Sequence, residues 1–323
     1  MAWAWQAVLC RVAYPLTMRI DYVIVAFRSA TDLAGCLDSI SADAPSNSGV
    51  IVVDNGSPDD SAEVAAGHPT APRVVRSDRN LGFGGGCNLG AKLSHADAVF
   101  FLNPDAVLVT GASATLVDAL SGNDRTGAVG PCVLDPTGES RAASAGAEPG
   151  LRSTIGHYLL LGRLPLLRGF FRPLHLARPN KPASPDWVSG AAMLVRRDAF
   201  EQVGGFDEQI FMYMEDVDLC RRLRSSGWGI DYRPNAIVEH RIGGSQSTDQ
   251  PIRWFNSYFD YLRRRSGSAN ARVASLIAGV GLGLRAIAYR SVRPANAARV
   301  NRAARAAFRL ALSRSDNRPS GQP

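Results

Sequence analysis

The feature that most constrains this chain is a run of five apolar residues at positions 98–102, followed at once by Asn103, Pro104 and Asp105. Such a run is typical of a buried strand. Pro104 has no N–H to donate to a sheet, so the strand is expected to end there. Ligands of open α/β sheets bind beyond the carboxyl ends of strands. The sequence therefore predicts a strand that presents Asp105 at a ligand-binding edge, although an acid there is also a common turn or helix-cap residue.

Strands and helices alternate along the first half of the chain. Apolar runs indicate the strands, and apolar residues spaced i, i+3, i+4 and i+7 indicate a helix. We expect strands at residues 22–27, 50–53, 74–75 and 98–102, and helices at residues 33–40 and 86–93. This order predicts an α/β fold with a mostly parallel sheet flanked by helices. Right-handed crossovers then place Asp54, which ends the second strand, at the same edge as Asp105. The residues after Asp54 also suit a plain β-turn.

Charge is distributed unevenly along the chain. Residues 261–323 hold thirteen arginines and one acid, whereas the chain as a whole has a net charge of only +7. A strongly basic C-terminal segment on a mildly acidic body suggests an anionic surface as its partner. Aromatic residues are largely missing between these arginines, so we expect no nucleic-acid partner. The five scattered cysteines include no C-x-x-C pair, which favours a reducing compartment without a zinc site.

A second group of acids begins a predicted helix in the C-terminal half. Glu215, Asp216 and Asp218 are followed by three arginines in the later turns of that helix. Acids at a helix N-terminus are favourable for the helix dipole, which accounts for some of them. The aromatic and methionine residues at 211–214 are expected to desolvate Glu215 and Asp216 in part. Desolvation raises the pKa of a carboxyl group toward that of a useful base.

His240 follows the second of two short strands predicted at residues 230–233 and 237–239. A lone histidine is more often structural than a ligand. The position of His240 after a strand matches those of Asp54 and Asp105, which favours contact with a metal ion or a phosphate. Before these strands, the pattern predicts a strand at residues 191–195 and a helix at residues 198–203.

The glycine-rich run at residues 82–86 suggests a second function. It is similar to the fingerprint of a nicotinamide-dependent oxidoreductase, but the strand before it is weak. No acid-ended strand lies at the expected distance beyond it either. Close approach of this glycine backbone to a nucleotide is a separate expectation that does not need the full fingerprint.

Taken together, these motifs resemble the family 2 glycosyltransferases of the GT-A type, particularly bacterial rhamnosyltransferases of cell-wall polysaccharide synthesis. The resemblance runs from about residue 20 to residue 261. It rests on Val-Val-Asp-Asn-Gly-Ser at 52–57, Asn80-Leu-Gly82 with Asn88, Asn103-Pro-Asp105, Trp187-Val-Ser-Gly190, and Gly-Gly-Phe-Asp-Glu with Phe-Met-Tyr-Met-Glu-Asp-Val-Asp-Leu in residues 204–219.

The resemblance implies an inverting, metal-dependent transfer of a sugar from a nucleotide. Asp216 would be the catalytic base, with Glu215 the competing choice. Asp105 and His240 would bind Mg²⁺ or Mn²⁺. The implied donor-nucleotide residues are Asp54, Asn55, Asn80, Gly82, Asn88 and Asn103, and the implied acceptor residues are Trp187, Gly190 and Glu215. Asn103 stands where many relatives have the first acid of an Asp-x-Asp pair, so the metal would depend more on the donor diphosphate.

The resemblance further implies dTDP-L-rhamnose as donor and a polyprenyl-diphosphate-linked or polysaccharide acceptor. Galactosyl, glucosyl or N-acetylglucosaminyl transfer is the alternative. Residues 250–254 match the Gln-x-x-Arg-Trp signature of processive polysaccharide synthases, which carry several transmembrane helices. No run of eighteen apolar residues occurs here. We therefore expect single-sugar addition and interpret Arg253 as a chance match or as a contact to the diphosphate.

These expectations divide the chain into four parts. They are a leader of doubtful structure at residues 1–17, the glycosyltransferase domain at 18–260, a basic amphipathic helical extension at 261–315 and a disordered tail at 316–323. Residues 155–171 predict a loop or broken amphipathic segment, either solvated or over the site or a membrane. The extension is either packed with a solvated basic face or bound to an anionic membrane. We expect a cytoplasmic protein, peripheral on the inner face of the plasma membrane.

Overall fold

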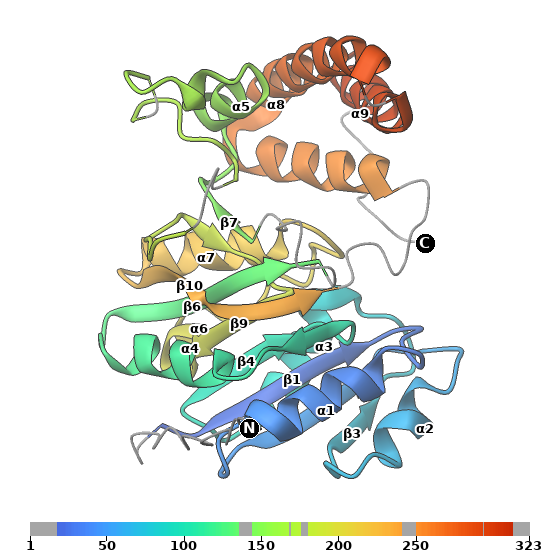
Figure 1. Ribbon diagram of the computed structural model, residues 1–323, viewed down its shortest axis with the longest axis vertical. Coiled ribbons are helices and arrows are strands. Elements are labelled where there is room, and N and C mark those ends of the chain that lie inside the picture. The colour runs from blue at the N-terminus through green and yellow to red at the C-terminus, as the bar shows by residue number, and fades with distance from the viewer. Residues whose placement is uncertain are drawn as a thin grey trace, which may run out of the picture.

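The computed structural model describes residues 18–135, 144–167, 169–175, 180–240, 250–292 and 294–312. The expected leader and tail lie outside these ranges. Figure 1 shows a central sheet with helices on both faces, and a separate helical layer at the top of the view. The sheet positions the candidate site.

The main sheet has eight strands in the order β3-β2-β1-β4-β9-β6-β10-β5. Parallel pairs join β3, β2, β1 and β4, and β6 with β10, whereas β9 and β5 run antiparallel to their neighbours. The strands are β1 (Ile20–Ala26), β2 (Gly49–Asp54), β3 (Arg73–Arg76), β4 (Ala98–Leu102), β5 (Ala106–Leu108), β6 (Thr126–Leu134), β9 (Ala192–Arg196) and β10 (Gly229–His240). The predicted strand at 98–102 is β4, and all five of its residues are buried.

One detail of the sheet was not specified by the sequence, and another differs from the expectation. The strand predicted near residues 191–195 exists as β9, but it runs antiparallel between β4 and β6. The two strands predicted at 230–233 and 237–239 form one strand, β10, with a register shift between Arg233 and Ile237. Pro234 lies in that interval, and a proline cannot complete the ladder, so the strand continues through an irregularity.

Helices cover both faces of the sheet because the side chains of each central strand alternate between two hydrophobic clusters. Tyr22 and Phe100 point into the cluster covered by α1 and α4, and Val23 and Phe101 into the other. The helices are α1 (Leu33–Asp43), α2 (Ser61–Ala66), α3 (Gly82–Ala91), α4 (Ala112–Ser121), α6 (Arg197–Gln202) and α7 (Glu215–Ser225). A two-stranded sheet pairs β7 (Ala145–Gly146) with β8 (Trp187–Val188).

The glycine-rich run forms the first turns of α3, which begins at Gly82 and not at the predicted residue 86. A Cβ on Gly86 would lie 2.6 Å from Val25 Cγ1, and one on Gly90 would lie 2.4 Å from Val23 Cγ1. These glycines therefore allow α3 to pack closely on β1. Close helix–sheet packing explains the run without a dinucleotide.

The helical layer contains α5 (Leu151–Tyr158), the turn η1 (Leu161–Arg163), α8 (Gln250–Val292) and α9 (Pro294–Leu312). Gly267 breaks α8 with φ 84° and ψ 161°. The first half of α8 packs on the body through Phe255, Tyr258 and Tyr261, and the second half lies in the top layer with α5 and α9 (Figure 1). The segment Ile252–Arg290 is long and apolar enough to cross a membrane, as some core helices of soluble proteins also are.

Candidate active site

Asp105 and His240 meet at one edge of the sheet. β10 is parallel to β6 and pairs with β5, so His240 lies opposite Ala106, the residue after Asp105. His240 Nε2 is 2.9 Å from Asp105 Oδ1 and 3.1 Å from Asn103 Nδ2. The side chains of Asp105 and His240 are 22% and 17% exposed, so both are accessible to a ligand. The predicted pair of metal ligands is thus brought together, with Asn103 beside it.

A metal bound here would need ligands beyond the protein. Among the residues that the structure describes, no cluster of three or more His, Cys, Asp or Glu side chains has the arrangement of a metal site. A carboxylate and an imidazole are suitable ligands for Mg²⁺ or Mn²⁺, which prefer six ligands. The remaining positions fit water and the oxygens of a bound diphosphate.

The antiparallel strand β9 brings Asp216 to this same edge. The carbonyl of Ala191 accepts a hydrogen bond of 2.9 Å from the N–H of Asn103. The preceding residue, Gly190, donates its N–H to Asp216 Oδ2 at 3.0 Å. Two adjacent residues, Gly190 and Ala191, therefore connect the end of β4 to the carboxylate of Asp216.

The segment before α7 has an unusual backbone. Tyr213 and Met214 both have positive φ, 64° and 71°. Residues other than glycine rarely adopt this backbone conformation, and each instance costs on the order of 1–3 kcal/mol. This strained segment ends at Met214, and Glu215 and Asp216 follow it directly as the first residues of α7. Ser257 Oγ on α8 donates to the Met212 carbonyl at 2.7 Å and supports this segment from outside.

Glu215 and Asp216 are adjacent but have different environments. Glu215 is 7% exposed, and its Oε2 has no hydrogen-bond partner. Burial, with a contribution from the charge of Asp216, raises the pKa of Glu215 to about 8. Burial also raises the pKa of Asp216, but N–H groups of Gly190 and Val217 donate to its two oxygens and oppose that rise. At neutral pH, Glu215 therefore holds a proton and Asp216 is the better-stabilised anion.

The residues after β2 form a hydrogen-bonded turn. Asp54 is buried, and its Oδ1 accepts from the N–H of Ser57 at 3.0 Å. Asn55 donates to Asn80 Oδ1 and to the Gly82 carbonyl, at 3.1 and 3.0 Å. Asn55 and Asn80 thus join this turn to the beginning of α3, and their amide groups are engaged within the protein.

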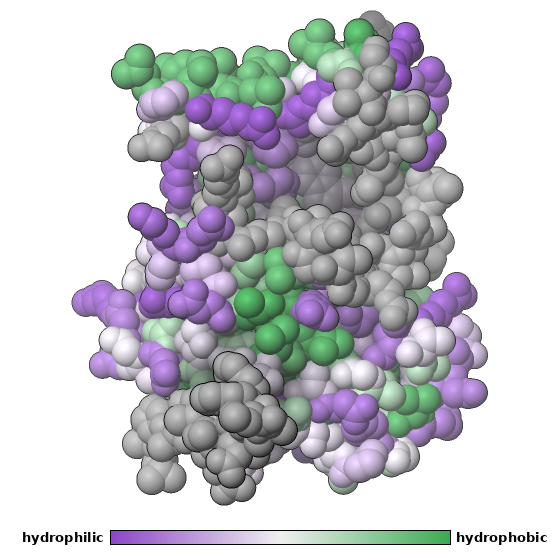
Figure 2. Space-filling view, viewed as in Figure 1, coloured by the Kyte–Doolittle hydropathy of each residue, from purple (hydrophilic) through white to green (hydrophobic). Residues whose placement is uncertain are grey.

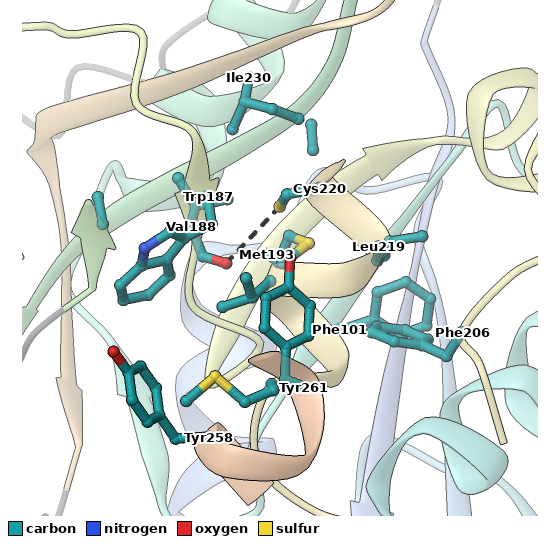
Figure 3. Packing of buried hydrophobic residues seen from close by; sticks show 14 of the residues in the cluster. Phe101, Trp187, Val188, Met193, Phe206, Leu219, Cys220, Ile230, Tyr258 and Tyr261 are labelled. Atoms are coloured by element: carbon teal, nitrogen blue, oxygen red, sulfur yellow. Dashed lines mark hydrogen bonds between the residues drawn. The ribbon is translucent and has the colours of Figure 1, made fainter. Parts of the chain in front are cut away.

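Three other predicted site residues have structural contacts. Asn88 on α3 bonds both the N–H and the carbonyl of Phe206, at 2.9 and 3.0 Å. Trp187 is a member of the buried cluster shown in Figure 3, and it donates Nε1–H to the Ala147 carbonyl at 3.0 Å. A Cβ on Gly82 would lie 2.4 Å from the Phe211 carbonyl oxygen. Arg253, by contrast, is exposed near the start of α8.

Comparison with known proteins identifies the family of this chain. The sequence profile described as Glycosyl transferase family 2 matches residues 21–204, more than half of the chain. The chain belongs to this family. The alternative function as a nicotinamide-dependent oxidoreductase, which was suggested by the glycine run, is therefore rejected.

Relatives agree with this assignment, and a solved structure shares the fold. The N-acetylglucosaminyl-diphospho-decaprenol L-rhamnosyltransferase of Mycobacterium tuberculosis is 36% identical over 249 residues, which cover 72% of this glycosyltransferase and 80% of the relative. The rhamnosyltransferase WbbL of Escherichia coli is 41% identical over 83 residues, 25% of this chain and 31% of that protein. The mannosyltransferase PcManGT of Pyrobaculum calidifontis, solved with GDP-Man and Mn²⁺, superposes with a TM-score of 0.60 at 16% identity, over 91% of this chain and 86% of its own. The expected GT-A type of fold is thereby confirmed.

Sequence reasoning missed two clusters of polar contacts in this glycosyltransferase. Asp218 pairs with Arg221 and Arg222 at 2.8 and 2.7 Å, and the i, i+3, i+4 spacing was an available signal. Glu148 bonds Arg224 on α7 at 3.2 Å and Tyr261 on α8 at 3.0 Å. No local pattern indicates the second cluster, because Glu148, Arg224 and Tyr261 lie far apart in the sequence.

Proposed function

We propose that this glycosyltransferase transfers a single L-rhamnosyl group from dTDP-L-rhamnose to a polyprenyl-diphosphate-linked or polysaccharide acceptor in cell-wall synthesis, with inversion at the sugar carbon. The relative of Mycobacterium tuberculosis, named for a decaprenol-linked acceptor and for L-rhamnose, supports this choice of donor and acceptor. The observation that carries the chemistry is the link from the end of β4 to Asp216 through Gly190 and Ala191.

Asp216 is the proposed base. A sugar hydroxyl is a weak nucleophile, and a carboxylate within hydrogen-bond reach removes its proton during attack. The two backbone N–H groups hold Asp216 in one orientation and favour its ionised form. Attack at C1 from the side opposite the leaving diphosphate inverts the configuration. Glu215, protonated beside it, is proposed to donate a hydrogen bond to the acceptor and not to remove the proton.

Asp105 and His240 are proposed to hold a divalent cation, Mg²⁺ or Mn²⁺. Nε2 of His240 faces both a carboxylate oxygen of Asp105 and the amide nitrogen of Asn103. A proton on Nε2 can be donated to the carboxylate, but Nε2 then cannot accept a hydrogen bond from the amide. A cation at this place would satisfy the carboxylate and the imidazole together. Such an ion neutralises charge on a leaving diphosphate. The neutral Asn103 adds no charge, so the donor itself is expected to complete the site.

Asp54 is proposed to accept a hydrogen bond from the ring N–H of the pyrimidine base. A carboxylate has about four lone-pair sites, and the N–H of Ser57 occupies one of them. Asn55, Asn80, Gly82 and Asn88 would then shape the donor site by holding the turns around it. Arg253, exposed on α8, stays a proposed contact to the diphosphate.

A donor panel tests the proposal. Purified protein is incubated with dTDP-L-rhamnose, UDP-galactose, UDP-glucose or UDP-N-acetylglucosamine, with Mg²⁺, Mn²⁺ or EDTA, and with N-acetylglucosaminyl-diphospho-polyprenol. Release of nucleoside diphosphate and the mass of the lipid product are measured. We expect release with dTDP-L-rhamnose and a product one deoxyhexose heavier. Faster transfer from a UDP-sugar would replace rhamnose in the proposal, and products with several added sugars would contradict single addition.

A further inference from the structure

Large apolar side chains are exposed across the top of the helical layer, where Figure 2 shows a band of hydrophobic residues. One part of the band is a ridge on the second half of α8: Val273, Leu276, Val280, Leu284 and Ile287. The other part follows α5: Leu159, Leu160, Leu164, Leu166, Leu167 and Phe170. We call these eleven residues the apolar cap. Leu166 is 98% exposed, so the protein itself gives this side chain almost no contact.

The second half of α8 buries small residues and exposes large apolar ones, which is the reverse of a helix on the surface of a water-soluble protein. Such a helix turns its large apolar residues toward the core. Here, apart from Leu282, the buried face is made of small residues, including Ala271, Ala274 and Ala278. On the outer face, Leu284 and Ile287 are 61% and 63% exposed. Small residues against protein and large apolar residues outside are the arrangement of a helix whose outer face contacts lipid.

The two segments that carry the apolar cap contain basic residues and no acid. Residues 149–185 contain six Lys or Arg and no acid, and residues 261–315 contain twelve Arg and no acid. Within these segments, the guanidinium of Arg152 lies 4.3 Å from the ring centroid of Phe170, and Arg285 donates to the His157 carbonyl at 2.6 Å. Arginines beside exposed leucines suit a membrane interface, where cations reach lipid phosphates and apolar side chains enter the acyl region.

We propose that the apolar cap docks into the interface of an anionic lipid bilayer. This goes beyond attachment through the basic extension, because half of the surface lies outside that extension, at residues 159–170, and because the contact is an insertion of apolar side chains. A second copy of the chain would bury the same leucines, but it would bring two acid-free basic surfaces together. The charge distribution therefore favours anionic lipid as the occupant.

Docking through this surface would also orient the site. The second half of α8 bears five residues of the cap, and its first half contacts the segment before α7 through Ser257 and the Met212 carbonyl. Tyr261 on the same helix reaches Glu148, which also bonds Arg224 of α7. Two sets of contacts thus connect the first half of α8, which precedes the break at Gly267, to α7 and to the segment before it.

Co-sedimentation tests the proposal with the full chain. The vesicles are phosphatidylcholine alone or with about 30% phosphatidylglycerol, each in low salt and in about 0.5 M NaCl. The variants are Leu284→Gln with Ile287→Gln, and Leu164→Gln with Leu166→Gln. Ile252→Gln is the matched control, an exposed apolar residue on α8 outside the cap. We expect the wild type and the control to bind anionic vesicles and to retain binding in high salt. Each double variant should bind about tenfold more weakly.

Undiminished binding of both double variants would overturn the proposal. So would a wild-type dimer that the variants convert to monomer with no lipid binding in either form, because the occupant would then be a second copy. Sedimentation is independent of sugar transfer, so its result does not depend on the proposed function.

A fluorescent label provides a second measurement that does not depend on a loss of binding. The environment-sensitive dye NBD is attached to Leu166→Cys in a Cys10→Ser background, because the cysteines in the described part of the chain are buried. Anionic vesicles should shift its emission to shorter wavelength. A label at the exposed Ser226→Cys, on the turn after α7, is the control and should not shift. An unshifted Leu166→Cys label in the presence of bound vesicles would contradict insertion.

Discussion

The backbone N–H of Gly190 donates a hydrogen bond of 3.0 Å to Oδ2 of Asp216. A Cβ on Gly190 would lie 3.4 Å from Asp216 Cβ and 3.0 Å from Phe83 Cε1, so the turn between β8 and β9 approaches α7 closely at this residue. Together with the bond from Val217, this contact orients the carboxylate toward one use and stabilises its charge. The carboxyl of Glu215 lacks such donors on Oε2. This asymmetry within one acidic pair leads to the first two predictions.

Asp216→Asn should abolish transfer while leaving donor binding intact. The amide cannot accept the acceptor proton, and loss of a general base costs about 10²–10⁴ in kcat. Glu215→Gln should keep kcat within about tenfold, because Glu215 already holds a proton at neutral pH. Nucleoside diphosphate release and donor titration calorimetry measure both effects. Near-normal turnover of Asp216→Asn, or a loss confined to Glu215→Gln, would move the role of base to Glu215.

Glu215 should make the folded state less stable as pH rises. Its pKa is raised from 4.5 to about 8 in the folded protein, so the folded state binds more protons than the unfolded chain between these values. The free energy of unfolding then falls across that interval. Glu215→Gln removes this dependence, so its stability relative to wild type should increase from pH 5 to pH 7 by at most about 3 kcal/mol. Urea unfolding at several pH values measures the slope. A constant difference between the two proteins would contradict the raised pKa.

Asp105→Asn and His240→Gln should each weaken the binding of Mn²⁺ in the presence of dTDP. The two side chains are the proposed protein ligands, and loss of one typically costs about tenfold or more in affinity. Asn103→Asp should act in the opposite direction, since it adds a charge beside them. Free Mn²⁺ measured by electron paramagnetic resonance gives the affinity without an activity assay. Asp198→Asn, an exposed acid on α6, is the control and should change nothing. Equal affinity in all four variants would remove the metal from this edge.

Asn88→Ala should lower stability before it alters donor specificity. The substitution leaves the N–H and carbonyl of Phe206 without their partner, and unmade bonds of buried groups cost about 1–3 kcal/mol each. The expected loss in the free energy of unfolding is about 2–4 kcal/mol. Asn270→Ala, which removes one exposed side-chain bond on α8, should cost less than about 1 kcal/mol. Chemical denaturation compares the two. A stable Asn88→Ala protein with weak donor binding would restore the predicted nucleotide contact.

The local sequence was sufficient to predict features that depend on neighbouring residues. The apolar run at 98–102 forms β4, which ends before Pro104, and the acids at 215–218 lie at the beginning of α7. Parallel strands share an edge for their carboxyl ends, so the proximity of Asp105 and His240 could be predicted from the positions of their strands. These are the parts of the site that the residue pattern by itself determined.

The tertiary structure decided what depends on distant partners. A short apolar run does not specify strand direction, so antiparallel β9 and its link between Asn103 and Asp216 were not predictable. Asn88 and Phe206, 118 residues apart, are joined only by the packing of α3 on the segment before α7. The glycines of α3 are needed because Val23 and Val25 on β1 leave no room for a Cβ at Gly90 and Gly86. In each case the pattern shows which groups are available, whereas folding brings the partner within bonding or van der Waals distance.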